Sequence, residues 1–216
     1  PLTSIRSAVE TLGLVKTDKD RKRLLTVLER DVWRADRLIT DISNASRLDA
    51  ELARDAPRPI MLERLLTDVV SIYDDDRGAK VLLGAPKGET FEVLGREGPF
   101  GQVFRNLIDN ARSFSPADGT VQVTLARDPG DDERPIRVTV EDDGPGIPED
   151  NLETVFRRFY TSRPKGAAFG SNSGLGLSIA RQIVEAHGGV ITAENRLGSS
   201  GKVEGARFTV RFPDGG

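Results

Sequence analysis

The 216-residue sequence has no cysteine, a single histidine and no long apolar run. Without cysteine, disulfides and thiolate metal sites are excluded within the chain. No stretch approaches the roughly 18 apolar residues that span a bilayer, and no signal peptide opens the sequence. The net charge of −3 disfavours general nucleic-acid binding, which requires a basic face. Because the chain starts at Pro1 without methionine, we expect a fragment of a longer protein.

Residues 1–54 have the pattern of a helical hairpin. Ile5, Val9 and Leu12 recur at helical spacing, and Asp18 or Asp20 would cap a second helix. The apolar positions of that second helix step by four and three, as in a coiled coil: Leu28, Val32, Ala35, Ile39 and Ile42. About fifty residues cannot bury such a seam alone, so we predict a homodimeric four-helix bundle. The alternative is that the seam packs on the later domain of the same chain.

Residues 55–59 are predicted to be a linker, because Pro57 and Pro59 end the helix and extend the chain. Residues 60–216 mix helical and strand patterns. Helices are predicted over 62–73, 101–114 and 174–186, and strands over 80–83, 90–94, 120–126, 136–141, 190–194 and 206–212. Because no regular βαβ repeat links them, the fold class is α+β, an α/β sandwich with helices on one sheet face.

The first motif with chemical meaning is a pair of asparagines in a predicted helix. Asn106 and Asn110 are four residues apart, so both carboxamides lie on one helix face. Asparagine is a mediocre helix former, and its amide oxygen suits a magnesium ion already neutralised by phosphates. Ordinary surface asparagines are the alternative.

The second motif follows a strand rich in valine and isoleucine, and reads Glu-Asp-Asp-Gly-Pro-Gly over residues 141–146. Glycines let the backbone turn sharply and approach a ligand. A buried carboxylate there could accept a hydrogen bond from an exocyclic amine such as that of adenine. Asp-Gly at a strand end is also a common turn, so this motif is weak by itself.

The third motif, Gly174-Leu-Gly-Leu177, opens a helix, where free amides and the helix dipole favour a phosphate. A serine-capped helix with close packing is the alternative. In the middle of the segment 148–173 that precedes it, residues 155–165 contain Arg157, Arg158, Arg163 and Lys165 and no acidic residue. A long cationic loop predicts a lid over a polyphosphate, and a solvated loop anchored by Phe156 and Phe159 is its alternative.

The motifs resemble, in order, the N, G1, F and G2 boxes of sensor histidine kinases: Asn-x-x-x-Asn, Asp-x-Gly-x-Gly, Phe-x-Arg-Phe and Gly-x-Gly. These kinases belong to the GHKL, or Bergerat-fold, ATPases. The resemblance covers essentially the whole chain, with residues 1–54 similar to the dimerisation and phosphoacceptor hairpin and 60–216 to the catalytic domain. It implies a protein-histidine kinase that uses ATP and Mg and relays the phosphoryl group to a response regulator receiver domain. It also implies a cytoplasmic portion of an inner-membrane sensor, with membrane contact only outside this chain.

The resemblance also implies residue roles. Asn106 and Asn110 would hold the magnesium ion, Asp142 would read the adenine amine, and Arg158 would approach the γ-phosphate. The catalytic set is then Asn106, Asn110 and Arg158. Many relatives have lysine where this chain has Ser113, and whether the adjacent Arg112 or a lid cation substitutes for it stays open. The remaining residues of the implied ATP site are Phe114, Gly144, Gly146, Ile147, Tyr160, Gly174, Leu175, Gly176, Leu177 and Gly205.

The phosphoacceptor is expected outside this chain. The family motif His-Glu-x-x-Asn-Pro aligns so that its histidine precedes Pro1 by five residues. The single histidine, His187, is expected to end a helix, with its charge suiting the helix dipole, and not to be phosphorylated. ATPases of the gyrase, chaperone or mismatch-repair type and anti-sigma kinases are disfavoured because they lack the hairpin. A catalytically silent module that dimerises and senses nucleotide stays open as an alternative.

Overall fold

The computed structural model describes residues 2–12, 15, 17–29, 31–32, 35, 56–74, 78–160 and 174–215. Helix α1 (Leu2–Leu12) opens the chain, and residues 18–29 form the second helix that the sequence predicts. The predicted cap of this helix, Asp18 or Asp20, is wrong. Thr17 is the cap, because its hydroxyl accepts a hydrogen bond from the Asp20 backbone N–H and donates one to the Asp20 carboxylate.

The described part of the hairpin exposes several apolar side chains. Val9, Leu25 and Val32 are exposed, whereas Ala8 is buried. The last predicted seam positions, Ile39 and Ile42, lie outside the described residues. Among the described helices, none has the length and apolar content that crossing a membrane requires.

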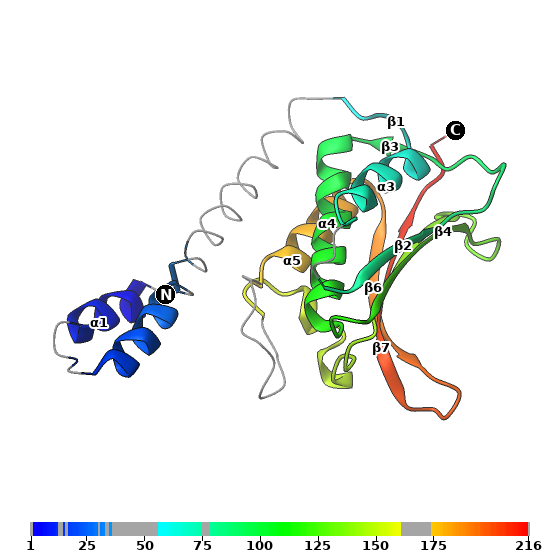
Figure 1. Ribbon diagram of the computed structural model, residues 1–216. Coiled ribbons are helices and arrows are strands. Elements are labelled where there is room, and N and C mark those ends of the chain that lie inside the picture. The colour runs from blue at the N-terminus through cyan, green and yellow to red at the C-terminus, as the bar shows by residue number, and fades with distance from the viewer. Residues whose placement is uncertain are drawn as a thin grey trace.

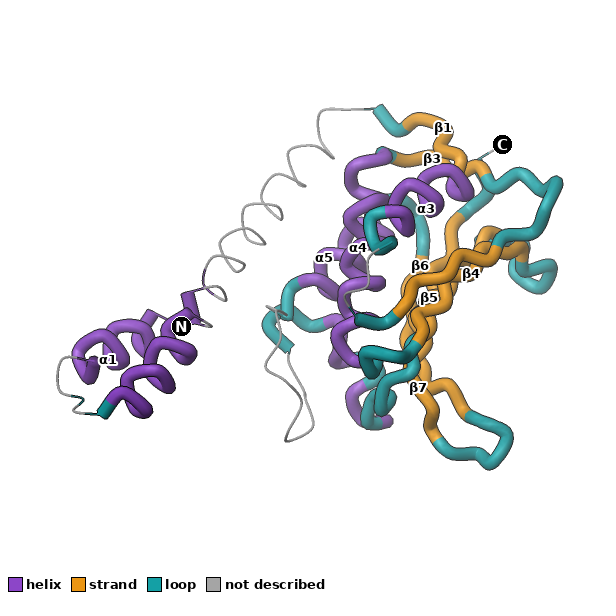
Figure 2. Tube along the Cα trace, in the orientation of Figure 1, coloured by secondary structure: helices purple, strands orange, loops and turns teal. Residues whose placement is uncertain are grey.

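A five-stranded mixed sheet forms one layer of the second part of the chain (Figures 1 and 2). Its strand order is β2-β4-β5-β7-β6, with β2 parallel to β4 and every other neighbouring pair antiparallel. The strands are β2 (Lys80–Gly84), β4 (Thr120–Arg127), β5 (Ile136–Glu141), β6 (Val190–Leu197) and β7 (Val203–Phe212). A separate antiparallel pair joins β1 (Arg58–Met61) to β3 (Glu92–Gly95).

Three helices cover one face of the five-stranded sheet, as Figure 1 shows: α3 (Leu62–Ser71), α4 (Glu97–Phe114) and α5 (Gly176–Ala186). The strands are amphipathic because alternate side chains point to opposite faces. In β4, for example, Val121, Val123 and Leu125 are fully buried, while Gln122 and Thr124 are only half-buried. The buried side chains form one core with those of the helices. Two short 3₁₀ helices, η1 (Glu149–Asn151) and η2 (Thr154–Phe156), follow β5.

The predicted sandwich with helices on one face is confirmed, and each helix and strand predicted after residue 60 is present. The sequence did not predict β1, which begins at Arg58 and therefore includes the last two residues of the expected linker. Four residues that include Pro59 give no alternating pattern, and the strand is defined by its pairing with β3.

His187 ends α5, as expected, but not through its charge. Its Nδ1 donates a hydrogen bond to the Ile183 carbonyl at 2.7 Å, and its ring lies 4.6 Å from the Phe100 ring. Burial lowers the pKa of His187, and the nearby Arg96 lowers it further. The expected favourable charge is therefore wrong, and the neutral ring caps the helix by hydrogen bonding.

Candidate functional site

Helix α4 presents three of the predicted site residues along one face. Asn106, Asn110 and Phe114 are spaced by four residues, so they follow one another along the same side of the helix. The Asn106 Nδ2 donates a hydrogen bond to the carbonyl of Gly176, the first residue of α5, at 3.0 Å. At the other end, the Phe114 Cβ lies 3.1 Å from where a Cβ on Gly144 would stand. One helix face thus contacts both predicted glycine motifs.

The two asparagines have the chemistry that a magnesium site needs. Because the amide nitrogen of Asn106 is used by Gly176, its Oδ1 is left as an acceptor. The Asn110 side chain makes no hydrogen bond within the described part of the chain. The described residues contain no group of three or more His, Asp or Glu side chains able to hold a metal by themselves. A magnesium ion at the two amide oxygens would therefore take its other ligands from phosphates and water, as Mg²⁺ commonly does.

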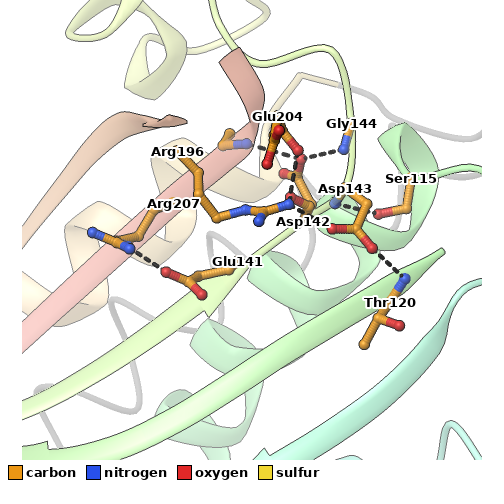
Figure 3. Close-up of polar contacts among 10 residues, drawn as sticks. Ser115, Thr120, Glu141, Asp142, Asp143, Gly144, Arg196, Glu204 and Arg207 are labelled. Carbon is orange, nitrogen blue, oxygen red and sulfur yellow. Dashed lines mark hydrogen bonds and ion pairs between the residues drawn. The ribbon is translucent and has the colours of Figure 1, made fainter. Parts of the chain in front are cut away.

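Asp142 follows β5 and is the buried carboxylate that the sequence predicts, with 2% of its surface exposed. Its Oδ1 accepts hydrogen bonds from the backbone N–H groups of Gly144 at 2.9 Å and Ala206 at 3.0 Å (Figure 3). Its Oδ2 has no hydrogen-bond partner among the described residues. Burial raises the pKa of Asp142, and the two backbone hydrogen bonds oppose this shift because they favour the charged form.

The turn after Asp142 needs its glycines for close packing. A Cβ on Gly144 would stand 2.8 Å from the Asp142 Oδ1. Gly146 has a φ of +76°, and a Cβ there would meet the side chains of Val203 at 2.3 Å and Asn195 at 2.7 Å. The neighbouring Ile147 packs its side chain against the core. These residues shape one end of the site through the backbone.

Gly205 lies against the same turn. A Cβ at this position would stand 1.8 Å from the carbonyl oxygen of Asp142, a distance that no real contact allows. The absence of a side chain lets β7 approach closely enough for Ala206 to hydrogen-bond both the backbone and the carboxylate of Asp142. The structure thus brings Gly205 to the predicted site as a support for Asp142.

The described ends of the predicted lid lie together. The Phe159 N–H donates a hydrogen bond to the Gly174 carbonyl at 2.9 Å, and a Cβ on Gly174 would stand 2.8 Å from the Tyr160 carbonyl oxygen. Arg158 is exposed, and its Nη2 lies 3.4 Å from the Gln182 Oε1 on α5. Arg157 is likewise exposed, and the other two cations of the predicted lid, Arg163 and Lys165, lie outside the described residues.

Three further residues of the predicted ATP site have side chains that pack within the fold: Arg112, Leu175 and Leu177. Arg112 packs its guanidinium over the Tyr73 ring and donates to the Ala79 carbonyl at 3.1 Å, on the side of α4 that faces α3. Leu175 is buried in the core, and Leu177 is half-buried against it. Leu175 can therefore line a ligand through its backbone only, and Arg112 is held by contacts within the fold.

The sequence did not point to two residues of β6 that hold the turn. The Asn195 side chain accepts a hydrogen bond from the Ile147 N–H and donates one to the Ile147 carbonyl, both at 2.7 Å. The Arg196 Nη2 donates to the Asp142 carbonyl at 3.3 Å and to the Asp143 Oδ1 at 2.6 Å. A strand that carries Asn and Arg on successive residues gives no sequence signal for either contact.

Comparisons with known proteins agree with this geometry. A family model described as "Histidine kinase-, DNA gyrase B-, and HSP90-like ATPase" matches residues 95–216, a range that contains every residue of the candidate site. Sensor protein ChvG of Rhizobium meliloti (strain 1021) is 51% identical, over 100% of this chain and 38% of its own length. Sensor histidine kinase WalK of Bacillus subtilis (strain 168) is 29% identical, over 98% of this chain and 34% of its own length.

Among solved structures, a mycobacterial sensor histidine kinase, MprB, matches with a TM-score of 0.61 and 25% identity. The match covers 74% of this chain and 98% of that structure. The chain spans less than two fifths of the length of ChvG and WalK. Its fold, its buried Asp142 and the family match lead to one assignment. The chain belongs to the family of histidine kinase-, DNA gyrase B- and HSP90-like ATPases, and the relatives that it resembles over nearly its whole length are a sensor protein and a sensor histidine kinase.

Proposed function

We propose that this chain is the core of a protein-histidine kinase in two-component signalling. It binds Mg-ATP and transfers the γ-phosphoryl group to a histidine of the dimerisation helix, upstream of Pro1, for relay to an aspartate of a response regulator. The observation that supports this most is the face of α4. Asn106, on this face, contacts the start of α5, and Phe114, at its far end, lies against the Asp142 turn.

Asp142 is the group proposed to select the base. An ionised carboxylate only accepts hydrogen bonds, so its Oδ2 fits the exocyclic amine of adenine. Guanine carries a carbonyl at the corresponding position, which would face the carboxylate oxygen without a proton between them. Phe114 would supply an apolar surface for the ring.

The phosphate end is proposed to lie between α4 and the start of α5. The first turn of α5 has backbone N–H groups without partners inside the helix, and the helix dipole favours an anion there. Asn106 and Asn110 would hold the magnesium ion, which would neutralise phosphate charge. Arg158, whose guanidinium is exposed, would offset the charge that develops on the γ-phosphoryl group. The protein then contributes positioning and charge stabilisation to the transfer.

Residues 1–54 are proposed to dimerise into a four-helix bundle and to provide the docking surface for the receiver domain. The exposed side chains of Val9, Leu25 and Val32 support this, because a second copy would remove them from water. Residues 60–216 would be the catalytic domain of the cytoplasmic portion of a sensor protein.

Two measurements test the proposal. Titration calorimetry of this chain with ATP, with and without magnesium, should show magnesium-dependent binding that Asn110→Ala removes. A longer chain that restores the upstream residues should then take acid-labile label from γ-labelled ATP, the behaviour of phosphohistidine. Nucleotide binding with no label on any such chain would favour a silent nucleotide-sensing module.

A further inference from the structure

Arg196 links three segments that surround the proposed base-binding carboxylate. From β6, its Nη2 donates hydrogen bonds to the Asp142 carbonyl at 3.3 Å, the Asp143 Oδ1 at 2.6 Å and the Glu204 carbonyl at 2.8 Å (Figure 3). The guanidinium lies over Gly205, where an added Cβ would be 3.3 Å from the Arg196 Nε. One side chain thus connects β6, β7 and the turn that follows β5.

Asp143 ties the same turn to the other side of the site. Its Oδ2 accepts a hydrogen bond from the Thr120 N–H at 2.8 Å, and its own N–H donates to the Ser115 Oγ at 3.2 Å. Ser115 is the residue that ends α4, and Thr120 begins β4. Since Asp143 is anchored on this side, Arg196 is the side chain that fixes Asp142 and Asp143 from the β6–β7 side, whereas Asn195 holds Ile147 further along the turn.

Arg196 also places a positive charge beside a buried carboxylate. Burial is the main influence that raises the pKa of Asp142, Arg196 lowers it, and Asp143 raises it. The other charged groups near the turn are Glu141 on β5 and Arg207 on β7, which form an ion pair with each other, and Glu204 on β7 (Figure 3). Arg196 is therefore a cation whose charge favours the ionised form of Asp142.

We propose that Arg196 is a positioning residue for base selection: it fixes the Asp142–Asp143 turn so that the free Oδ2 of Asp142 remains an acceptor aimed at the adenine amine. This inference rests on the proposed function of Asp142. Without Arg196, Asp142 and Asp143 lose their hydrogen bonds to β6, although Asn195 still holds Ile147, and Asp142 takes up a proton more readily. A protonated Asp142 can donate to a carbonyl such as that of guanine, so discrimination against GTP should weaken.

The test compares Arg196→Met, which keeps the aliphatic stem, with Arg196→Lys, which keeps the charge. Dissociation constants for Mg-ATP and Mg-GTP are measured by calorimetry from about pH 5.5 to about pH 8. Arg196→Met should weaken ATP binding about tenfold, the loss of a charge-assisted contact, and lower the ratio of ATP to GTP affinity. Its ATP affinity should also begin to fall at a higher pH than in the wild type. Arg196→Lys should keep the wild-type pH profile, with a base preference between those of the wild type and Arg196→Met.

The matched control is Arg207→Met, which removes an arginine that pairs with Glu141 and Glu194 on the same sheet but does not contact Asp142. It should leave the base preference and the pH profile unchanged. Wild-type base preference and pH profile in folded Arg196→Met would overturn the inference. If that variant does not fold, a wild-type base preference in Arg196→Lys would overturn it instead. Failure of the wild-type chain to bind ATP, or an unchanged base preference in Asp142→Ala, would instead refute the proposed function itself.

Discussion

Gly205→Ala tests whether the close approach of β7 to the Asp142 turn supports the fold. The added methyl group would stand 1.8 Å from the Asp142 carbonyl oxygen, whereas real Cβ contacts essentially never fall below 3.0 Å. Because the obstacle is backbone and not a flexible side chain, β7 or the turn must move. Such a movement pulls apart the pair of hydrogen bonds between Asp142 and Ala206, both 3.0 Å long.

The expected loss can be worked from these contacts. A neutral backbone hydrogen bond contributes about 1 kcal/mol and one to a carboxylate about 1.5–3 kcal/mol. The φ of Gly205, +156°, is also unfavourable for alanine, which adds roughly 1 kcal/mol. We therefore expect Gly205→Ala to lower the free energy of unfolding by about 3.5–5 kcal/mol.

The assay is urea unfolding followed by circular dichroism, whose signal includes the five-stranded sheet. The matched control is Gly201→Ala. Gly201 has a φ of +75° with no atom within 4 Å of an added Cβ, so the control costs only the conformational term of about 1 kcal/mol. If both variants lose the same stability, the close approach of β7 to Asp142 does not support the fold, and the reasoning is refuted.

Three further predictions concern single side chains. Asn110→Ala should weaken magnesium-dependent ATP binding by at least about tenfold in calorimetry while keeping the wild-type melting temperature, because the side chain makes no hydrogen bond in the described structure; equal affinity would remove Asn110 from the metal site. Asp142→Ala should bind ATP and GTP alike, and a retained preference for ATP would contradict its role in base selection. His187→Gln should reduce the loss of unfolding free energy that occurs as the pH falls. Burial lowers the pKa of His187, so only the unfolded chain gains a proton as the pH falls below about 6.5, and wild-type stability decreases there. Unfolding free energies at about pH 7.5 and about pH 5.5 should therefore differ more in the wild type than in the variant.

The sequence was sufficient for features that depend on short spacings. Asn106 and Asn110 are one helical turn apart, and Asp142 directly follows an alternating strand, so local periodicity was enough to propose their positions. The order of the helices and strands could be predicted for the same reason. The contacts that orient these residues could not, because they join segments far apart in the chain.

Three contacts illustrate why the orientation of the site residues could not be predicted from the sequence. Asn195 is 48 residues from Ile147, Arg196 is 54 from Asp142, and Ala206 is 64 from Asp142. These pairs depend on the order of β5, β7 and β6 in the sheet, which periodicity does not reveal. The prediction of a charged His187 was wrong for a similar reason. Its ring is buried partly through a contact with Phe100, which joins the end of α5 to the first turns of α4.

The rise per residue of an α-helix is constant, so the distance between two side chains on α4 is fixed for any ligand that binds along it. Eight residues separate Asn106 from Phe114, which corresponds to about 12 Å along the axis. A ligand that engages both ends must span that gap, and an extended nucleoside triphosphate is long enough. Adenosine alone would occupy the aromatic end and leave the amide end empty. Under the proposed function, this fixed spacing would favour a full nucleotide over its fragments.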